Sequence, residues 1–366
     1  MQHADLWGWF YAEQRRAHRE NDPYRAKLPD LYDSGWNAMR EERGEEALSY
    51  FQEGLQIARH LEDPCWELFF EHWRNVVYLF TLSDYAKALE NIVQTTAHAH
   101  KPQYLNCPIR ARVYYSLLFI YYEMDPFGYE AKVREVMEYM ETSVPLDEDT
   151  LFRIQYKKGS LAYLHEDYNL AEKLFSNYMN MLPPHADLRM AGGYSMLGVI
   201  AYCKGDFHTA IQLSHQAEAL ARKARLQGLV GEELLWRAVY EYRIGNTEQA
   251  KALHEQGIAH FERYQILKNL DYFNAICEYL EINGEIEAAI NAREEANKIV
   301  HEYGSPDYDV KAAIQYCRLL GRCGKDIVDA IQHAEQAMTK LLKPDYYEEK
   351  LVRIKSGDFT EYRWQQ

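Results

Sequence analysis

Apolar side chains recur along the chain at helical spacing. Between residues 190 and 222, one set follows the i, i+3, i+4 rule and a second set follows it after a short break, at Tyr194, Leu197, Ile200 and Ala201, then at Ala210, Leu213, Ala217 and Leu220. Residues three and four apart share one face of an α-helix, so the pattern predicts two amphipathic helices joined by a turn. The alternation typical of strands is absent from the sequence. The pattern therefore predicts an all-α protein built from helix pairs.

The turn between the helices of a pair returns at a regular interval. A Gly or acidic residue stands five positions before an Ala in four clear copies, which begin at Glu166, Gly205, Gly245 and Gly284. Weaker copies extend the series of alanines to Ala47, Ala88, Ala131, Ala171, Ala210, Ala250, Ala289 and Ala330, which lie 39 to 43 residues apart. Such a period is typical of a repeat array, here of about eight units. Alanine suits a close helix crossing, where a larger side chain costs about 1–3 kcal/mol.

Prolines and the chain ends set the boundaries that we predict. Nine prolines are expected between the helix pairs, where a missing N–H does little harm: Pro29, Pro64, Pro102, Pro108, Pro145, Pro183, Pro184, Pro306 and Pro344. Terminal repeats need a cover for their apolar side. We therefore predict an N-terminal capping helix within residues 1–28, the array over 29–344, and a C-terminal capping helix and tail over 345–366. The aromatic run 7–11 is interpreted as a packed part of the cap, with an exposed docking element as the alternative.

The units resemble the tetratricopeptide repeat (TPR). With the anchor Ala at position 20, the residues of the fifth unit that carry the resemblance are Tyr194 at 4, Leu197 at 7, Gly198 at 8, Ala201 at 11, Gly205 at 15, Phe207 at 17, Ala210 at 20 and Ala217 at 27. Length alone also fits HEAT or armadillo repeats, and the Gly/Ala signature decides for TPR. The resemblance implies a right-handed superhelical solenoid of about eight helix hairpins with short capping helices.

The period of about 40 residues exceeds the 34 usual for TPR units. It is similar to the long arrays of bacterial peptide-pheromone receptors of the Rap type. Only about 28 residues precede the first unit, so we do not expect the N-terminal effector domain of those receptors.

Charge and cysteine usage narrow the classes of partner. Lys and Arg total 41 against 56 Asp and Glu, a net charge of −15, which disfavours nucleic acid and anionic membranes as partners because both repel an acidic surface. No apolar run approaches the roughly 20 residues that span a bilayer, and no secretion signal is recognisable. The six cysteines are too scattered for a disulfide framework. We therefore expect a cytoplasmic protein.

Catalytic spacing is missing from the sequence. It contains no phosphate-binding glycine loop, zinc-protease helix motif or nucleophile elbow. His98, His100 and Cys107 form a weak candidate metal site, because residues two apart on a helix point to different faces. Cys317 and Cys323 are interpreted as small core residues. We therefore predict no enzyme, and no catalytic, cofactor or metal site.

The resemblance implies that positions 2, 5, 9, 12 and 13 of each unit face a concave groove. The candidate groove residues are Trp73, Phe80, Arg153, Tyr156, Lys157, Tyr163, Tyr202, Tyr242, Arg243, Asn274, Glu278 and Glu281. An aromatic column occupies position 12, and the charge changes from basic near Arg153 to acidic near Asp271. Such a groove suits an extended or helical peptide anchored by buried aromatics. Packing between repeats is the alternative explanation of the column.

The sequence thus predicts a non-enzymatic TPR module that binds a peptide or protein segment in its groove. Two alternatives stay open: a peptide-sensing regulator resembling the Rap-type receptors, and a scaffold subunit of a larger complex that uses its outer face or its ends. The identity of the partner and the oligomeric state are left open.

Overall fold

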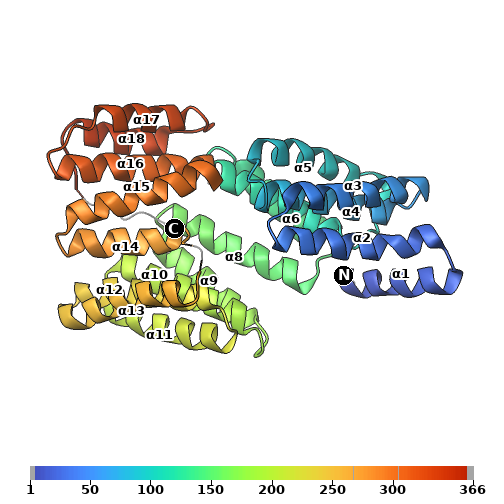
Figure 1. Ribbon diagram of the computed structural model, residues 1–366, viewed down its shortest axis with the longest axis horizontal. Helices are drawn as coiled ribbons and strands as arrows, with labels where there is room; N and C mark the ends of the chain where they lie inside the picture. Colours follow the sequence, from blue (N-terminus) through green and yellow to red (C-terminus); the bar gives the residue numbers. More distant parts are fainter. Residues whose placement is uncertain (1–4, 267, 304, 361–366) are drawn as a thin grey trace. The chain divides into compact units, whose positions relative to one another are not determined.

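The computed structural model describes residues 5–266, 268–303 and 305–360 (Figure 1). Over these residues the chain forms α-helices and one short 3-10 helix, and no strand. In chain order the helices are α1 (Leu6–Glu20), α2 (Pro23–Arg40), α3 (Gly44–His60), α4 (Pro64–Phe80), α5 (Tyr85–Ala99), η1 (Pro102–Tyr104), α6 (Arg110–Met124), α7 (Glu130–Ser143), α8 (Glu148–Leu164), α9 (Tyr168–Met181), α10 (Asp187–Lys204), α11 (Phe207–Lys223), α12 (Gln227–Arg243), α13 (Thr247–Arg263), α14 (Leu270–Ile282), α15 (Ile286–Tyr303), α16 (Pro306–Arg322), α17 (Val328–Met338) and α18 (Asp345–Lys355). The predicted all-α class is confirmed.

The helices form consecutive pairs, as the repeat predicts. Across the described residues, α2–α3 is the first pair and α16–α17 the eighth, with α1 before the array and α18 after it. Within most pairs the two helices pack against each other, and the second helix usually packs against the first helix of the next pair. We call the earlier helix of each pair its first helix. This succession of helix hairpins is the fold of a helical-repeat solenoid.

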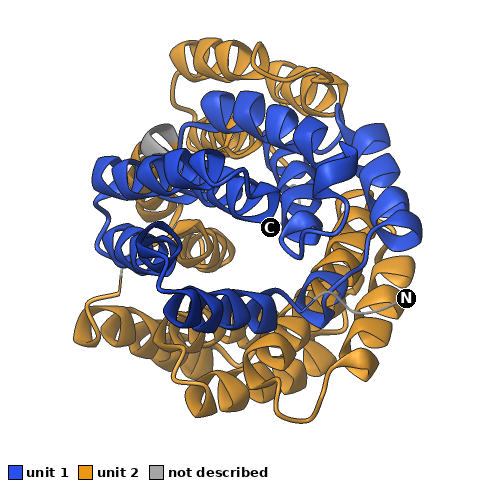
Figure 2. Ribbon diagram, turned by 90° about the vertical axis from the view of Figure 1, so that its right-hand side faces the viewer, with its two compact units in different colours: residues 1–151 blue, residues 152–366 orange. Residues whose placement is uncertain are grey.

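The chain divides into two compact units, coloured separately in Figure 2. Unit 1 comprises residues 1–151 and unit 2 residues 152–366. The boundary lies within α8, in the middle of the array, and the sequence analysis did not anticipate it. The finer division into capping segments and array stays a prediction. It is compatible with the packing of α1 on α2 in unit 1 and of α18 on α16 in unit 2.

The anchor alanines are buried where two helices of a pair cross. Seven of the eight are buried, from Ala47 to Ala330. Ala131 is the exception: it is exposed, and Val133 is the buried residue of that turn. Gly205 ends α10 with φ of 82°, a left-handed conformation that glycine adopts without strain. The structure therefore agrees with the predicted glycine turn at Gly205 and with the predicted anchor alanines, except for Ala131 in the third unit.

Glycines and phenylalanines fit together within the pairs. A Cβ atom on Gly35 would lie 2.4 Å from the ring of Phe51, and one on Gly159 would lie 2.7 Å from the ring of Phe175. Both glycines stand at position 8 and both rings at position 24 of their units, so the contact is a repeated device that lets the two helices approach.

One proline departs from the expected positions. Pro29 lies inside α2, which begins at Pro23, and not between two helix pairs. Asp22 caps α2 by accepting hydrogen bonds from two backbone N–H groups of its first turn, so the helix starts six residues earlier than the predicted array. The other eight prolines lie between pairs or at the first position of a first helix.

The N-terminal aromatic run is only partly packed. Phe10 is buried, and the ring centroid of Trp9 lies 4.9 Å from that of Trp66 on α4. Trp7 and Tyr11 remain exposed. The packed-cap interpretation therefore describes Trp9 and Phe10, and a docking role for the exposed residues stays a prediction.

Candidate ligand-binding site

Three of the predicted groove residues meet in unit 2. They come from three consecutive first helices: Tyr202 from α10, Arg243 from α12 and Glu278 from α14. The Tyr202 hydroxyl donates to Glu278 Oε1 at 2.5 Å, and Arg243 Nη2 donates to the Tyr202 hydroxyl at 3.1 Å and to Glu278 Oε1 at 3.0 Å. We call these residues the Tyr–Arg–Glu cluster. The cluster joins side chains that are up to 76 residues apart in the sequence, so α10, α12 and α14 approach one another at this point.

The charged side chains of the cluster are partly exposed, whereas its ring is packed. The side chains of Arg243 and Glu278 keep 27% and 20% of their exposure. The Tyr202 ring is buried and contacts the rings of Phe207, Trp236 and Tyr240. The ring of Tyr202 therefore packs between repeats, and its hydroxyl bonds with Arg243 and Glu278. That the aromatic column anchors a peptide stays a prediction.

Carboxylates stand at the other end of the same face. Glu232 lies in the second turn of α12 and Asp271 in the first turn of α14, and Asn269 donates to Glu232 Oε1 at 2.8 Å. Burial and the nearby charge of Glu232 raise the pKa of Asp271 to about 7. Burial also raises the pKa of Glu232. Glu232 stands at position 2 of the sixth unit, one of the positions that face the groove in TPR proteins. It was not among the predicted groove residues, although the same rule would have selected it.

Glu233, next to Glu232 on α12, is enclosed in the core. Burial raises its pKa to about 7 from the ordinary 4.5, against hydrogen bonds to Ser195 and Ser214. The sequence offered no signal for this residue, because an acidic side chain beside a groove position is expected to be solvated.

The raised pKa of Glu233 predicts a pH-dependent stability. A folded-state pKa above the unfolded value means that the folded chain binds more protons, so this group stabilises folding increasingly as the pH falls from about 7 towards 4.5. At pH 8 its charge costs up to about 3 kcal/mol. We expect Glu233→Gln to raise the melting temperature at pH 8 more than at pH 5. Glu255→Gln, on an exposed position of α13, is the control; equal effects of both variants would contradict the prediction.

The other predicted groove residues of unit 2 lie in less open surroundings. Tyr163 is buried, with its hydroxyl 3.8 Å from Cys203 Sγ, so it is a core ring and not an accessible anchor. Glu281 is also buried, in an ion pair with Arg318 and Arg322 that neutralises it. Outside this buried pair, the acidic residues are Glu232 and Asp271 near the starts of α12 and α14, and Glu278 beside Arg243 near their other ends.

The remaining residues of unit 2 differ in exposure. Tyr156 packs its ring on Phe175, Tyr242 packs on Tyr279, and Asn274 accepts a hydrogen bond from Arg293 at 3.1 Å. Lys157 is buried and Arg153 is exposed.

Two predicted residues belong to unit 1. Trp73 is buried among the rings of Tyr32, Trp36 and Phe69. Phe80 is 61% exposed and contacts Phe119, with ring centroids 5.3 Å apart. These two residues belong to the other compact unit and are not part of the site described in unit 2.

The weak candidate metal ligands point to different partners. His98 Nδ1 lies 3.1 Å from the Glu71 carboxylate, the His100 ring packs on Tyr114, and Cys107 forms a disulfide with Cys65. Within the described residues, no group of three or more such side chains is arranged to hold a metal ion. In the same part of the chain, no helix is both long and apolar enough to cross a bilayer.

Comparisons with known proteins identify the fold. No protein-family model matches the sequence, and no curated protein matches it significantly. Among solved structures, the chain is similar to the Rap conjugation gene regulator of the plasmid pLS20 in complex with the Phr* peptide, at 15% identity, over 90% of this chain and 97% of that chain, with a TM-score of 0.56. This likeness shows that the chain is a TPR-like helical-repeat protein.

Two further solved structures match less closely. The human IFIT1 dimer with PPP-AAAA matches at 14% identity over 89% of this chain and 82% of that chain, with a TM-score of 0.38. The TPR domain of P58(IPK) matches at 14% identity over 91% and 88%, with a TM-score of 0.25. These scores are too low to carry an argument.

Proposed function

We propose that the chain is a non-enzymatic interaction module that binds a peptide or protein segment along the first helices of unit 2. The observation that carries this proposal is the Tyr–Arg–Glu cluster, whose charged side chains are partly exposed. In repeat proteins of this kind, stacked helix pairs create an extended concave surface for binding. Residues contributed by three consecutive repeats are suited to a ligand that is long in one direction.

The charges of this face define the kind of segment that fits. Arg243 has the donors to hold a ligand carboxylate in two hydrogen bonds, and Glu232 and Asp271 have acceptors for an ammonium or guanidinium group. Glu232 and Arg243 are separated on α12 by about 16 Å along the helix axis. An extended chain covers this distance with about five residues. The proposed ligand is thus a short extended segment with a cationic group near one end and a carboxylate near the other.

A peptide-sensing regulator is the second candidate. It is favoured by the fold likeness to the pLS20 regulator, which was solved with its Phr* peptide. A ligand carboxylate that replaces Glu278 beside Arg243 would release α14 from α10 and alter the winding of unit 2. A change in the radius of gyration by X-ray scattering on peptide addition favours this candidate, whereas an unchanged radius favours a passive interaction module.

The proposed partner is a protein, and the proposed compartment is the cytoplasm. The net charge of −15 opposes nucleic acid and anionic membranes. A scaffold role, with contacts on the outer face, is the outcome to consider if variants of the Tyr–Arg–Glu cluster leave binding intact.

The proposal is tested by peptide selection against the full chain. Random peptides of six to twelve residues are displayed and selected, and the enriched sequences are synthesised and titrated by calorimetry. We expect Arg243→Gln and Glu232→Gln each to weaken binding by about tenfold or more, the equivalent of about 1.4 kcal/mol. The matched control is Arg222→Gln on α11, which removes an exposed pair with Glu218 and should change the affinity less than twofold.

Two results would contradict this proposal. One is that no peptide is enriched, and the other is that enriched peptides bind wild type and the Arg243 and Glu232 variants equally. Circular dichroism of each variant establishes that it is folded before its affinity is interpreted.

A further inference from the structure

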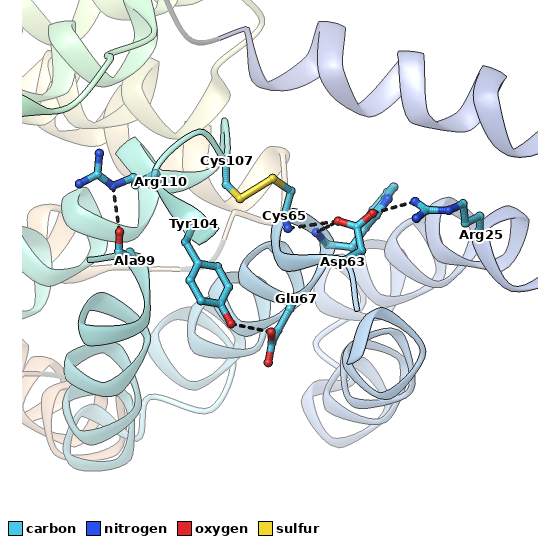
Figure 3. The surroundings of a disulfide bond; sticks show 9 residues. Arg25, Asp63, Cys65, Glu67, Ala99, Tyr104, Cys107 and Arg110 are labelled. Atoms are coloured by element: carbon cyan, nitrogen blue, oxygen red, sulfur yellow. Dashed lines mark hydrogen bonds and ion pairs between the residues drawn. A yellow bond between two sulfur atoms is a disulfide. The ribbon is translucent and has the colours of Figure 1, made fainter. Parts of the chain in front are cut away.

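The Cys65–Cys107 disulfide links two neighbouring repeats of unit 1. Cys65 lies in the first turn of α4, and Cys107 lies just before α6 (Figure 3). The two residues are 42 positions apart, about one repeat period, so the bond joins equivalent points of consecutive units. Helices α4 and α6 also pack against each other. The bond therefore fixes the spacing between the entry ends of two adjacent first helices.

The other cysteines indicate the chemical setting of this bond. Cys203, Cys277, Cys317 and Cys323 are thiols, and the first three are buried. A chain adapted to an oxidising compartment uses its cysteines as a framework of several bonds. One bond beside four thiols is instead typical of a protein kept among cellular reductants, where disulfides are transient and often redox-sensing. The disulfide is therefore better explained as reversible than as a fixed structural staple.

We propose that Cys65 and Cys107 form a reversible thiol–disulfide site that controls how residues 101–109 are held on α4. The reductant is a dithiol of the thioredoxin class. Its thiolate attacks Cys65 Sγ, which is half-buried, because Cys107 is almost fully enclosed. Cys107 leaves as a thiolate and takes a proton from water. This step bonds the reductant to Cys65 through a mixed disulfide.

The second step completes the balance of electrons and protons. The second thiol of the reductant attacks the reductant's own sulfur in the mixed disulfide and releases Cys65 as a thiolate, which takes up a proton. The chain has then gained two electrons and two protons, and the reductant has become a disulfide. Oxidised glutathione drives the reverse reaction and is itself reduced to two thiols.

Contacts other than the disulfide also hold residues 101–109, and they limit how far this segment opens when the disulfide is reduced. The Tyr104 hydroxyl donates to Glu67 Oε2 on α4 at 2.6 Å, and its ring is nearly parallel to that of His98 (Figure 3 shows Tyr104 and Glu67). Beyond this segment, Arg110 Nε donates to the Ala99 carbonyl oxygen at 3.0 Å. These contacts remain after reduction. The segment therefore opens more often while the helices of unit 1 stay folded.

The charges around Cys65 are balanced. Asp63 caps α4 by accepting hydrogen bonds from the N–H groups of Cys65 and Trp66, and it pairs with Arg25 at 2.7 Å. A reductant that approaches Cys65 thus meets a neutralised carboxylate and not an isolated negative charge. The site is open to a thiolate, which is itself negatively charged.

The test equilibrates the full chain with mixtures of reduced and oxidised glutathione, traps thiols by alkylation and reads each cysteine by mass spectrometry. We expect Cys65 and Cys107 to pass together from disulfide to thiols as the proportion of reduced glutathione rises, with Cys277 and Cys317 unalkylated in the folded chain. Hydrogen exchange should then be at least tenfold faster over residues 101–109 in the reduced chain. Exchange in α11 of unit 2, the internal control, should be unchanged.

Three outcomes overturn this proposal: a bond that resists reduced glutathione and thioredoxin until the chain unfolds, a bond that oxidised glutathione does not restore, and equal exchange over 101–109 in both states. The double variant Cys65→Ser/Cys107→Ser should exchange like the reduced chain, and Cys277→Ser like wild type. If the double variant does not fold, alkylated reduced wild type gives the same comparison. None of these readouts depends on a ligand of unit 2.

Discussion

Replacement of Glu281 by alanine is expected to lower the free energy of unfolding by about 3–5 kcal/mol. The Glu281 and Arg318 side chains are 4% and 1% exposed, and both carboxylate oxygens accept hydrogen bonds from the guanidinium. Burial alone would raise the pKa of Glu281, but the hydrogen bonds and charge of Arg318 outweigh it and lower the pKa. Removal of the carboxylate leaves a buried cation without its counter-charge. Urea unfolding followed by far-UV circular dichroism measures the loss.

Arg322→Ala is the matched control for Glu281. Arg322 contacts the same carboxylate but is 36% exposed, and its removal leaves the pair of Glu281 with Arg318 in place. We expect a loss of less than about 1 kcal/mol, as for other exposed ion pairs. Equal losses from the two variants would contradict the assignment of Glu281 to the core and return it to the accessible face.

Reduction of the Cys65–Cys107 disulfide is expected to lower the free energy of unfolding of unit 1 by about 4 kcal/mol. The bond closes a loop of 42 residues, and the cross-link removes conformational entropy from the unfolded chain in proportion to the logarithm of loop length. Five of the seven tryptophans lie within residues 1–151. Tryptophan fluorescence during urea unfolding therefore reports mainly on unit 1.

The cysteine variants separate this effect from other thiol chemistry. Cys65→Ser/Cys107→Ser should show the same loss and no further response to dithiothreitol. Cys323→Ser, at a half-buried thiol of unit 2, should respond to dithiothreitol like wild type. A loss of less than about 1 kcal/mol on reduction would mean that the bond does not constrain the unfolded chain, and would contradict the prediction.

Much of the fold was predictable because small residues recur at the same position in most repeats. Ala210 and its equivalents mark helix crossings that tolerate no larger side chain, so their spacing shows the period directly. The prediction that Ala131 is a buried anchor was wrong, because the third unit keeps the repeat period but buries Val133 in place of the alanine. The prediction for Pro29 was wrong because a proline usually marks a break between helices, whereas Pro29 is the seventh residue of α2. The boundary at residue 151 has no local sequence signal, since it depends on how whole repeats pack.

Site residues were predictable where the position within the TPR unit alone determines which way a side chain points. Tyr202, Arg243 and Glu278 stand at positions 12, 13 and 9, and they meet on one face. Tyr163 and Glu281 also stand at position 12 but are buried, because their surroundings come from other repeats: Arg318, which neutralises Glu281, lies 37 residues further along the chain. The disulfide was missed because the sequence was searched for short spacings, and a separation equal to the repeat period was not considered.

The central claim is that a peptide segment lies on the first helices of unit 2. The most direct test is photo-crosslinking of a selected peptide that carries a photoreactive residue, followed by mapping of the linked chain residues by mass spectrometry. Crosslinks are predicted on α10, α12 and α14, with loss of crosslinking in Arg243→Gln. Crosslinks confined to the second helices α11, α13 and α15, or to unit 1, would contradict the claim.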